Sequence, residues 1–136
     1  MEVKKWEKLS RNAKEKLAGA ILSNKNMHFN NSVENAFFAI ELALKSLLFQ
    51  TFPDAEDSEF WGHRIMDLLQ KRNGFLQSLF VQDVLAYKLL VEIAGDANVW
   101  APRDRYYGDA DRALADKYCN SSEWLLKWIE LNYWNE

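Results

Sequence analysis

Hydrophobic residues recur at spacings of three and four over most of the chain, which is the period of an amphipathic α-helix. The first such stretch starts near Trp6 and stops at the polar run 23–26. A second starts after Asn31, which stands three residues before Glu34 in the arrangement of a capping box. The pattern therefore predicts two long helices in the first part of the chain.

The second of these helices is hydrophobic over more than one face. Phe38, Leu42 and Phe49 lie off its main stripe, and a helix that is apolar on several faces is either central in a bundle or part of an interface. The main stripe, which we expect to be buried, consists of Val33, Ala36, Phe37, Ile40, Leu44, Leu47 and Leu48.

Three further helices are predicted after the acidic loop that follows Pro53. The first is short, begins near Ile65 and closes near Asn73 and Gly74. The second covers about 76–93 and ends at Gly95. The last is expected to begin after Asp109 as N-cap and to continue to about Tyr133.

Length and composition place these helices in one unit. A chain of 136 residues with 49% hydrophobic content can bury one core, and no stretch alternates with the period of two that a strand requires. We predict an all-α fold, a four-helix up-down bundle with an additional short helix, as a single domain over residues 1–136. The aromatic content of 14% exceeds what such a core needs, so we expect some rings to meet a partner.

The sequence also bears on the compartment. Cys119 is the single cysteine and cannot form an intramolecular disulfide, and no secretory leader pattern opens the chain. The longest apolar stretches are interrupted by Glu41 and Glu92 well before the length of a membrane span. We expect a cytoplasmic protein without a membrane segment.

Charge is distributed unevenly along the chain. Residues 1–25 contain seven Lys or Arg against three Glu, a net charge of +4, and the remainder carries −7. A basic first helix on an acidic body can attract phosphate groups, although a run of charge is more often a solvated helix face.

Three stretches resemble the HEPN domain, a family of small helical bundles that occur beside minimal nucleotidyltransferases and in RNA-cleaving toxins. Segment 34–48 is similar to the family's second helix, with Glu41 and Lys45 in an Ala/Leu-rich run. Segment 63–69 resembles its His-x-Leu-x-x-Leu motif, with Ile at the first Leu position. Segment 105–108 stands where the family has an Arg-Tyr-Pro turn, although Tyr replaces the Pro. The resemblance implies a HEPN-like bundle and a homodimer.

The family's ribonuclease motif, an Arg followed after four to six residues by His, is missing. His28 and His63 are the only histidines, and no Arg precedes either at that spacing. Cleavage of RNA at neutral pH needs a group that titrates near neutrality. We therefore assign no catalytic residue and expect a noncatalytic nucleotide- or RNA-binding subunit that acts with a separately encoded nucleotidyltransferase, as in a toxin–antitoxin or defence pair.

Two alternatives remain open from the sequence. One is a ribonuclease toxin with a degenerate site, for example His63 with Arg105. The other is a stress or defence scaffold that binds only protein, for which the tryptophans of the last helix are the relevant feature. We expect no cofactor or metal, since two separated histidines and one cysteine lack ligand spacing.

The candidate ligand-binding residues are those that bind phosphate or stack on bases. Guanidinium groups bind phosphate with two parallel hydrogen bonds, and tyrosine rings stack on bases. Each candidate also has a structural interpretation: a packed turn, a helix cap or an ordinary Glu–Lys helix pair. The candidates are Arg103, Arg105, Tyr106, Tyr107, His63, Arg64, Glu41 and Lys45.

The last helix carries apolar side chains on two faces, which suggests a core seam and a subunit seam. We predict a homodimer in which the interface includes Trp124, Trp128, Leu131, Phe38 and Leu42.

Overall fold

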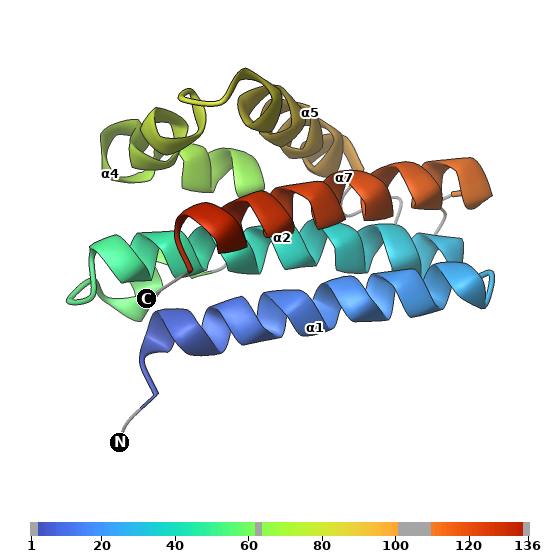
Figure 1. The fold of residues 1–136 in the computed structure, drawn as a ribbon, viewed down its shortest axis with the longest axis horizontal. Helices are drawn as coiled ribbons and strands as arrows, with labels where there is room; N and C mark the ends of the chain where they lie inside the picture. Colours follow the sequence, from blue (N-terminus) through green and yellow to red (C-terminus); the bar gives the residue numbers. More distant parts are fainter. Residues whose placement is uncertain (1–2, 62–63, 101–109, 135–136) are drawn as a thin grey trace.

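The structure, a computed structural model, describes residues 3–61, 64–100 and 110–134. Within these ranges every regular element is a helix, so the all-α prediction is confirmed. In Figure 1 the long helices α1, α2 and α7 lie side by side, with α4 and α5 on the side of α2 away from α1. The helices are α1 (Lys5–Lys25), α2 (Phe29–Thr51), α3 (Asp57–Phe60), α4 (Ile65–Phe80), α5 (Val84–Trp100) and α7 (Arg112–Asn132).

Helix α2 is the centre of the bundle. It packs against α1, α4 and α7, and 13 of its 23 residues are buried. The whole predicted stripe of α2 is buried, and so is Phe49. Alanines at 36, 39 and 43 are fully buried and lack long side chains, so neighbouring backbones can approach closely.

Buried serines tie the neighbouring helices to α2. Ser32 Oγ donates a hydrogen bond of 2.7 Å to the carbonyl of Ala20 in α1, and Ser122 Oγ of α7 donates to the carbonyl of Ala36 at 3.2 Å. A buried hydroxyl without a partner would destabilise the fold. These bonds satisfy the two hydroxyls and set the positions of α1 and α7 against α2.

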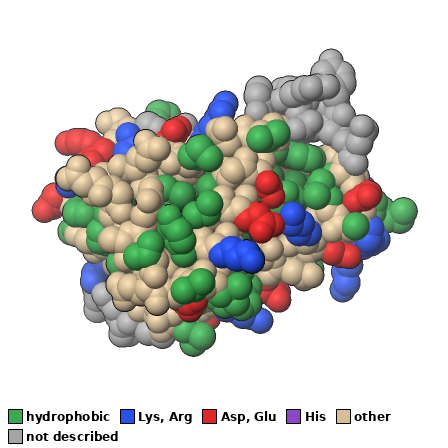
Figure 2. All heavy atoms as spheres, turned by 90° about the horizontal axis from the view of Figure 1, so that it is seen from above, with side chains coloured by type: hydrophobic (Ala, Val, Ile, Leu, Met, Phe, Trp, Pro, Cys, Tyr) green, Lys and Arg blue, Asp and Glu red, His purple; other side chains and the backbone are tan. Residues whose placement is uncertain are grey.

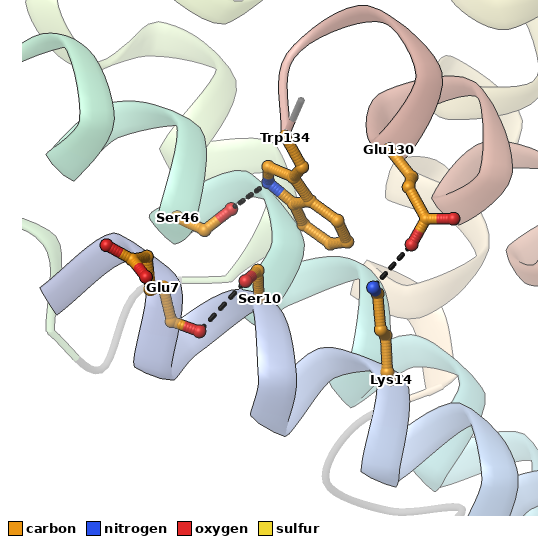
Figure 3. Close-up of polar contacts among 6 residues, drawn as sticks. All are labelled: Glu7, Ser10, Lys14, Ser46, Glu130 and Trp134. Atoms are coloured by element: carbon orange, nitrogen blue, oxygen red, sulfur yellow. Dashed lines mark hydrogen bonds and ion pairs between the residues drawn. The ribbon is translucent and has the colours of Figure 1, made fainter. Parts of the chain in front are cut away.

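The end of the described chain is fixed on the same core, as Figure 3 shows. The indole Nε1 of Trp134 donates to Ser46 Oγ of α2 at 2.9 Å. Lys14 of α1 forms an ion pair with Glu130 of α7, and its Nζ lies 5.6 Å from the centre of a Trp134 ring. The C-terminal turn therefore joins α1, α2 and α7 at one point.

Two predicted N-caps are corrected. Helix α2 begins at Phe29, so Asn31 lies within the helix and is not its cap. Helix α7 begins at Arg112, and its cap is Asp111, whose Oδ1 accepts a hydrogen bond of 2.9 Å from the Leu114 amide. Asp109, the expected cap, lies outside the described residues.

The predicted helix over about 76–93 is two helices. Helix α4 ends at Phe80 and α5 begins at Val84. Between them Asp83 Oδ1 accepts from the amides of Leu85 and Ala86 at 3.0 and 3.1 Å, which is how an N-cap side chain stabilises a new helix start. Gly95 does not end α5, which continues to Trp100.

Helix α4 is interrupted at 71–74, close to the predicted end of the short helix. Arg72, Asn73 and Gly74 have φ values of 53°, 59° and 74°, in the left-handed region. Such a conformation costs a residue with a Cβ atom about 1–2 kcal/mol, whereas glycine adopts it freely. The turn interrupts the helix, and the Arg72 side chain there reaches Glu59 of α3.

We predict opposite stability effects for two Gly→Ala substitutions. Gly74→Ala should lower the free energy of unfolding by about 1–2 kcal/mol, because an added Cβ is strained at positive φ. Gly19→Ala should raise it by about 0.5–1 kcal/mol, because Gly19 is inside α1 and a Cβ there would meet only ordinary contacts. Urea denaturation followed by circular dichroism measures both values, and equal effects would contradict the assigned turn.

Candidate functional site

An open pocket lies between α1, α2 and α3, and we call it the aromatic pocket. Its volume is about 520 Å³, within the range of about 300–1,000 Å³ that is typical of small-molecule sites. The pocket exists because α3 is only four residues long and leaves part of α2 uncovered. Its lining residues are Lys5, Leu9, Phe38, Glu41, Leu42, Lys45, Phe49, Asp57, Phe60 and Trp61.

Aromatic rings form the base and the rim of this pocket. Phe49 and Phe60 are buried and pack edge to face, with ring centres 5.1 Å apart. Phe38 and Trp61 are 44% and 78% exposed. The buried pair is accounted for by the core, whereas the two exposed rings offer flat apolar surfaces to a ligand.

Two cations and two carboxylates complete the lining. Lys45 is buried on α2, and its Nζ lies 3.6 Å from Glu41 Oε2, so the pair predicted at this spacing is present. Lys5 forms an ion pair with Asp57, and its Nζ lies 4.6 Å from the centre of the Phe49 ring. The pocket thus has opposite charges at two places within largely apolar walls.

A second ion pair holds α3 against the turn of α4. Arg72 Nε and Nη2 donate to the two carboxylate oxygens of Glu59 at 2.5 and 2.9 Å, and the guanidinium lies 4.5 Å from the centre of the Phe52 ring. The hydrogen bond from Arg72 holds the pKa of Glu59 below its usual value. A helix of one turn has little stability of its own. We call this pairing of Arg72 with Glu59 the α3 clasp.

A smaller pocket of about 220 Å³ adjoins the first and shares Phe38 and Glu41 with it. Arg64 lines this pocket and donates from Nη1 to Asn98 Oδ1 at 2.9 Å. Trp100 also lines it, and within the described part of the chain its buried Nε1 has no hydrogen-bond partner. The structure thus brings Glu41, Lys45 and Arg64, three of the predicted binding residues, around one part of α2.

The structure does not describe the remaining predicted ligand-binding residues. Arg103, Arg105, Tyr106, Tyr107 and His63 lie outside the described residues. Their proposed role in binding phosphate or bases therefore stays a prediction from the sequence.

The residues predicted for a subunit interface fall into two groups. Phe38 and Leu42 line the aromatic pocket. Trp128 is half-buried within its own subunit, with its ring centre 4.8 Å from that of Phe80 and its Nε1 bonded to Asp83 at 3.0 Å. On α7, Trp124 and Leu131 are 36% and 72% exposed.

Sequence reasoning missed four polar or exposed residues that line or support the site. Lys5 belonged to the basic run of the first helix, but the pattern did not show that it reaches α3. Asp57 and Trp61 were part of an unassigned loop, and the acidic run around Asp57 was the available signal. Arg72 gave no signal, because its role depends on a left-handed turn at a residue that rarely adopts one.

The described side chains do not support two other kinds of site, a reactive cysteine and a metal site. Cys119 is buried, its Sγ lies 3.3 Å from Ser32 Oγ, and burial raises the pKa of its thiol, which disfavours the reactive thiolate. Among the described side chains, no three His, Cys, Asp or Glu residues are grouped so that they could hold a metal ion. No helix in the described ranges has the length and apolarity needed to cross a membrane.

Comparison with known proteins adds no assignment: no protein-family model, curated protein or solved structure matches the chain. The functional conclusion therefore depends on the geometry of the aromatic pocket and on the sequence.

The α3 clasp should make stability depend on pH. Because the pKa of Glu59 is lowered in the folded state, its stabilising effect is present above the usual value of 4.5 and is lost as pH falls through the lowered value. Glu59→Gln should therefore be less stable than the parent at neutral pH, and the difference should vanish in acid. Urea denaturation across this range measures it.

Glu56→Gln is the matched control, because Glu56 directly precedes α3 and its side chain makes no cap hydrogen bond. It should show no such pH-dependent difference from the parent. A Glu59→Gln difference that persists unchanged in acid would contradict a charge-based clasp.

Proposed function

We propose that this chain is a noncatalytic binding subunit that takes a nucleotide, or one base of a single-stranded RNA, in the aromatic pocket. One observation carries the proposal: a pocket of nucleotide size in which exposed rings stand beside two lysines. The proposal includes a four-helix up-down bundle of the HEPN kind, in keeping with the sequence stretches around Glu41, His63 and Arg105.

The exposed rings supply the apolar part of recognition. A base that enters the pocket meets Trp61 and Phe38 at the rim, and stacking of one base on an aromatic side chain contributes about 1–3 kcal/mol. The requirement is a flat ring that is free of core packing. Trp61 meets this requirement best, since 78% of its surface is exposed.

The lysines supply the polar part. The side chains of Lys5 and Asp57 are 46% and 76% exposed, and an ion pair in such a position contributes little. A phosphate can therefore replace Asp57 as the partner of Lys5 at small cost. Lys45 is much less exposed, and its ammonium group offers donors to an acceptor on the base or sugar.

The proposed subunit binds without catalysing a reaction, and this part of the proposal comes from the sequence. Neither His28 nor His63 follows an Arg at the spacing that the HEPN ribonucleases use. A subunit that binds without cleaving needs a separate enzyme, and a nucleotidyltransferase encoded nearby is the partner that the resemblance implies.

A second candidate function is the docking of an apolar side chain from a protein partner. It is favoured by the same exposure of Trp61 and Phe38 and by the largely apolar walls of the pocket. Binding experiments with nucleotides separate the two functions, because a pocket that recognises only protein will not respond to AMP or RNA.

We predict that the parent binds AMP or a short single-stranded RNA and that Trp61→Ala weakens binding about tenfold or more, through loss of stacking. Trp124→Ala, which removes a partly exposed indole on α7, should leave the affinity unchanged. Isothermal titration calorimetry measures both. Equal affinities for the parent and Trp61→Ala would place the ligand elsewhere, and a parent that binds neither probe would refute the function.

We also predict salt-sensitive binding without ribonuclease activity. Replacing Arg103 and Arg105 together by Ala should reduce the affinity and flatten its dependence on salt, because each phosphate contact releases condensed counterions. RNA incubated with the parent in EDTA should remain intact, since neither His28 nor His63 stands at the ribonuclease spacing that would supply the proton transfer, which is worth roughly 10²–10⁴-fold. Unchanged binding by the double variant would exclude the two arginines, and metal-independent cleavage would refute the noncatalytic assignment.

A further inference from the structure

The buried lysine of the aromatic pocket has hydrogen-bond donors that its ion-pair partner does not take up. Only 10% of the Lys45 side chain is exposed, and its Nζ lies 3.6 Å from Glu41 Oε2, which is longer than a hydrogen bond. A buried ammonium group whose donors lack acceptors destabilises a fold. Because Lys45 lines the pocket, an acceptor on a bound ligand would remove this cost.

Other Lys–Glu pairs of the fold are open to solvent. Figure 2 shows the face formed by α4 and α5, on which acidic and basic side chains stand side by side at the surface. In the pair of Lys117 with Glu92 the side chains are 48% and 42% exposed. In the pair of Lys127 with Glu123, four residues apart on α7, they are 73% and 46% exposed. Water satisfies the donors of such lysines. Lys45 differs from them in its burial.

Helical spacing places an exposed ring next to the buried pair. Phe38, Glu41 and Lys45 follow one another at intervals of three and four on α2, so they lie on one face of the helix. The Phe38 side chain is 44% exposed and offers a surface on which a base can stack. The edge of a base stacked there comes within reach of the carboxylate and the ammonium group. We call Glu41 and Lys45 the α2 pair.

The α2 pair divides acceptors and donors between its two members. The Glu41 carboxylate only accepts hydrogen bonds and has two oxygens side by side, whereas the Lys45 ammonium group only donates. A matching base edge therefore carries two neighbouring N–H donors and, next to them, an acceptor oxygen. Guanine carries these groups in that order, as N2–H, N1–H and O6.

The other RNA bases match the α2 pair less well. Uracil has a single N–H between two carbonyl oxygens, so one oxygen would face the carboxylate. Cytosine has an amino group beside two acceptors, and adenine has an amino group beside one acceptor. None of the three offers two neighbouring N–H donors to the carboxylate. A polar group that stays unpaired in a desolvated site lowers affinity, so guanine should bind most tightly.

We infer that the aromatic pocket selects guanine, with Glu41 accepting from N1–H and N2–H and Lys45 donating to O6. The inference rests on the proposed nucleotide-binding function and adds the identity of the base. Lys5 is separate from the α2 pair, on α1, and stays available to the phosphate. The low exposure of Lys45 makes the pair suitable for discrimination, because water does not replace a missing ligand group there.

Isothermal titration calorimetry of the parent with GMP, IMP and AMP tests the inference. IMP has O6 and N1–H but lacks the amino group at C2, so its comparison with GMP isolates one hydrogen bond. GMP should bind roughly 10–100-fold more tightly than AMP, with IMP between them. Equal affinities for GMP and AMP, or for GMP and IMP, would overturn the inference and leave the proposed function standing. A parent that binds none of the three would overturn both.

Two substitutions assign the contacts, and circular dichroism confirms that each variant folds. Glu41→Gln replaces one acceptor oxygen by a donor, so the ratio of GMP to IMP affinity should fall to about one. Lys45→Met keeps an unbranched side chain but removes the donors to O6, so GMP and IMP should both bind more weakly at an unchanged ratio. Glu123→Gln alters an exposed Glu–Lys pair of the same spacing on α7 and should change nothing. A full preference for GMP over IMP in Glu41→Gln would overturn the inference, and the parent series tests it even where a variant does not fold.

Discussion

Burial of most of α2 is the constraint on which the rest of this structure depends. A helix with so many buried positions needs neighbours around most of its circumference, since each exposed Leu or Ile side chain would forgo about 1.5–3 kcal/mol. Helices α1, α4 and α7 meet that need, and the buried serines at 32 and 122 satisfy their hydroxyls on carbonyls of the adjoining helices. The positions of α1 and α7 are thus determined by both apolar packing and hydrogen bonding.

The aromatic pocket is where this coverage is incomplete. Over the second half of α2 the covering element is α3, which is too short to fill the space between α1 and α2. Lys45 lies at this place, and its neighbour Glu41 gives the buried ammonium a counter-charge. The position of α3 depends in turn on the α3 clasp, so the left-handed turn at Arg72 determines the shape of a pocket that it does not line.

The sequence predicted the parts of the fold that local periodicity controls. The long helices α1, α2 and α7 were assigned because their buried stripes repeat at helical spacing. The break between α4 and α5 was missed because Leu79, Phe80 and Val84 continue that spacing across it, although Asp83 before an apolar run was a possible N-cap signal.

The site was less predictable because it depends on contacts between distant segments. Glu41 and Lys45 were found as a pair on one helix, but periodicity does not show that Lys5, Asp57 and Trp61 gather around them. Trp128 shows that helical spacing alone also does not distinguish an interface residue from one packed within the chain. Its spacing fitted an interface, yet Asp83 and Phe80 of its own subunit hold the indole.

The outward face of α5 is the feature that the fold of a single chain does not explain. Its inward residues Leu90 and Ile93 cover the core. Replacement of Val84, Val91 and Val99 by polar residues would leave that packing unchanged. A solvated helix normally carries polar side chains on its outer face. Valine is also a weaker helix former than Lys, Glu or Gln, so the exposed valines improve neither solubility nor helix stability. Exposed apolar side chains that serve neither core packing nor solubility are typical of an interaction surface.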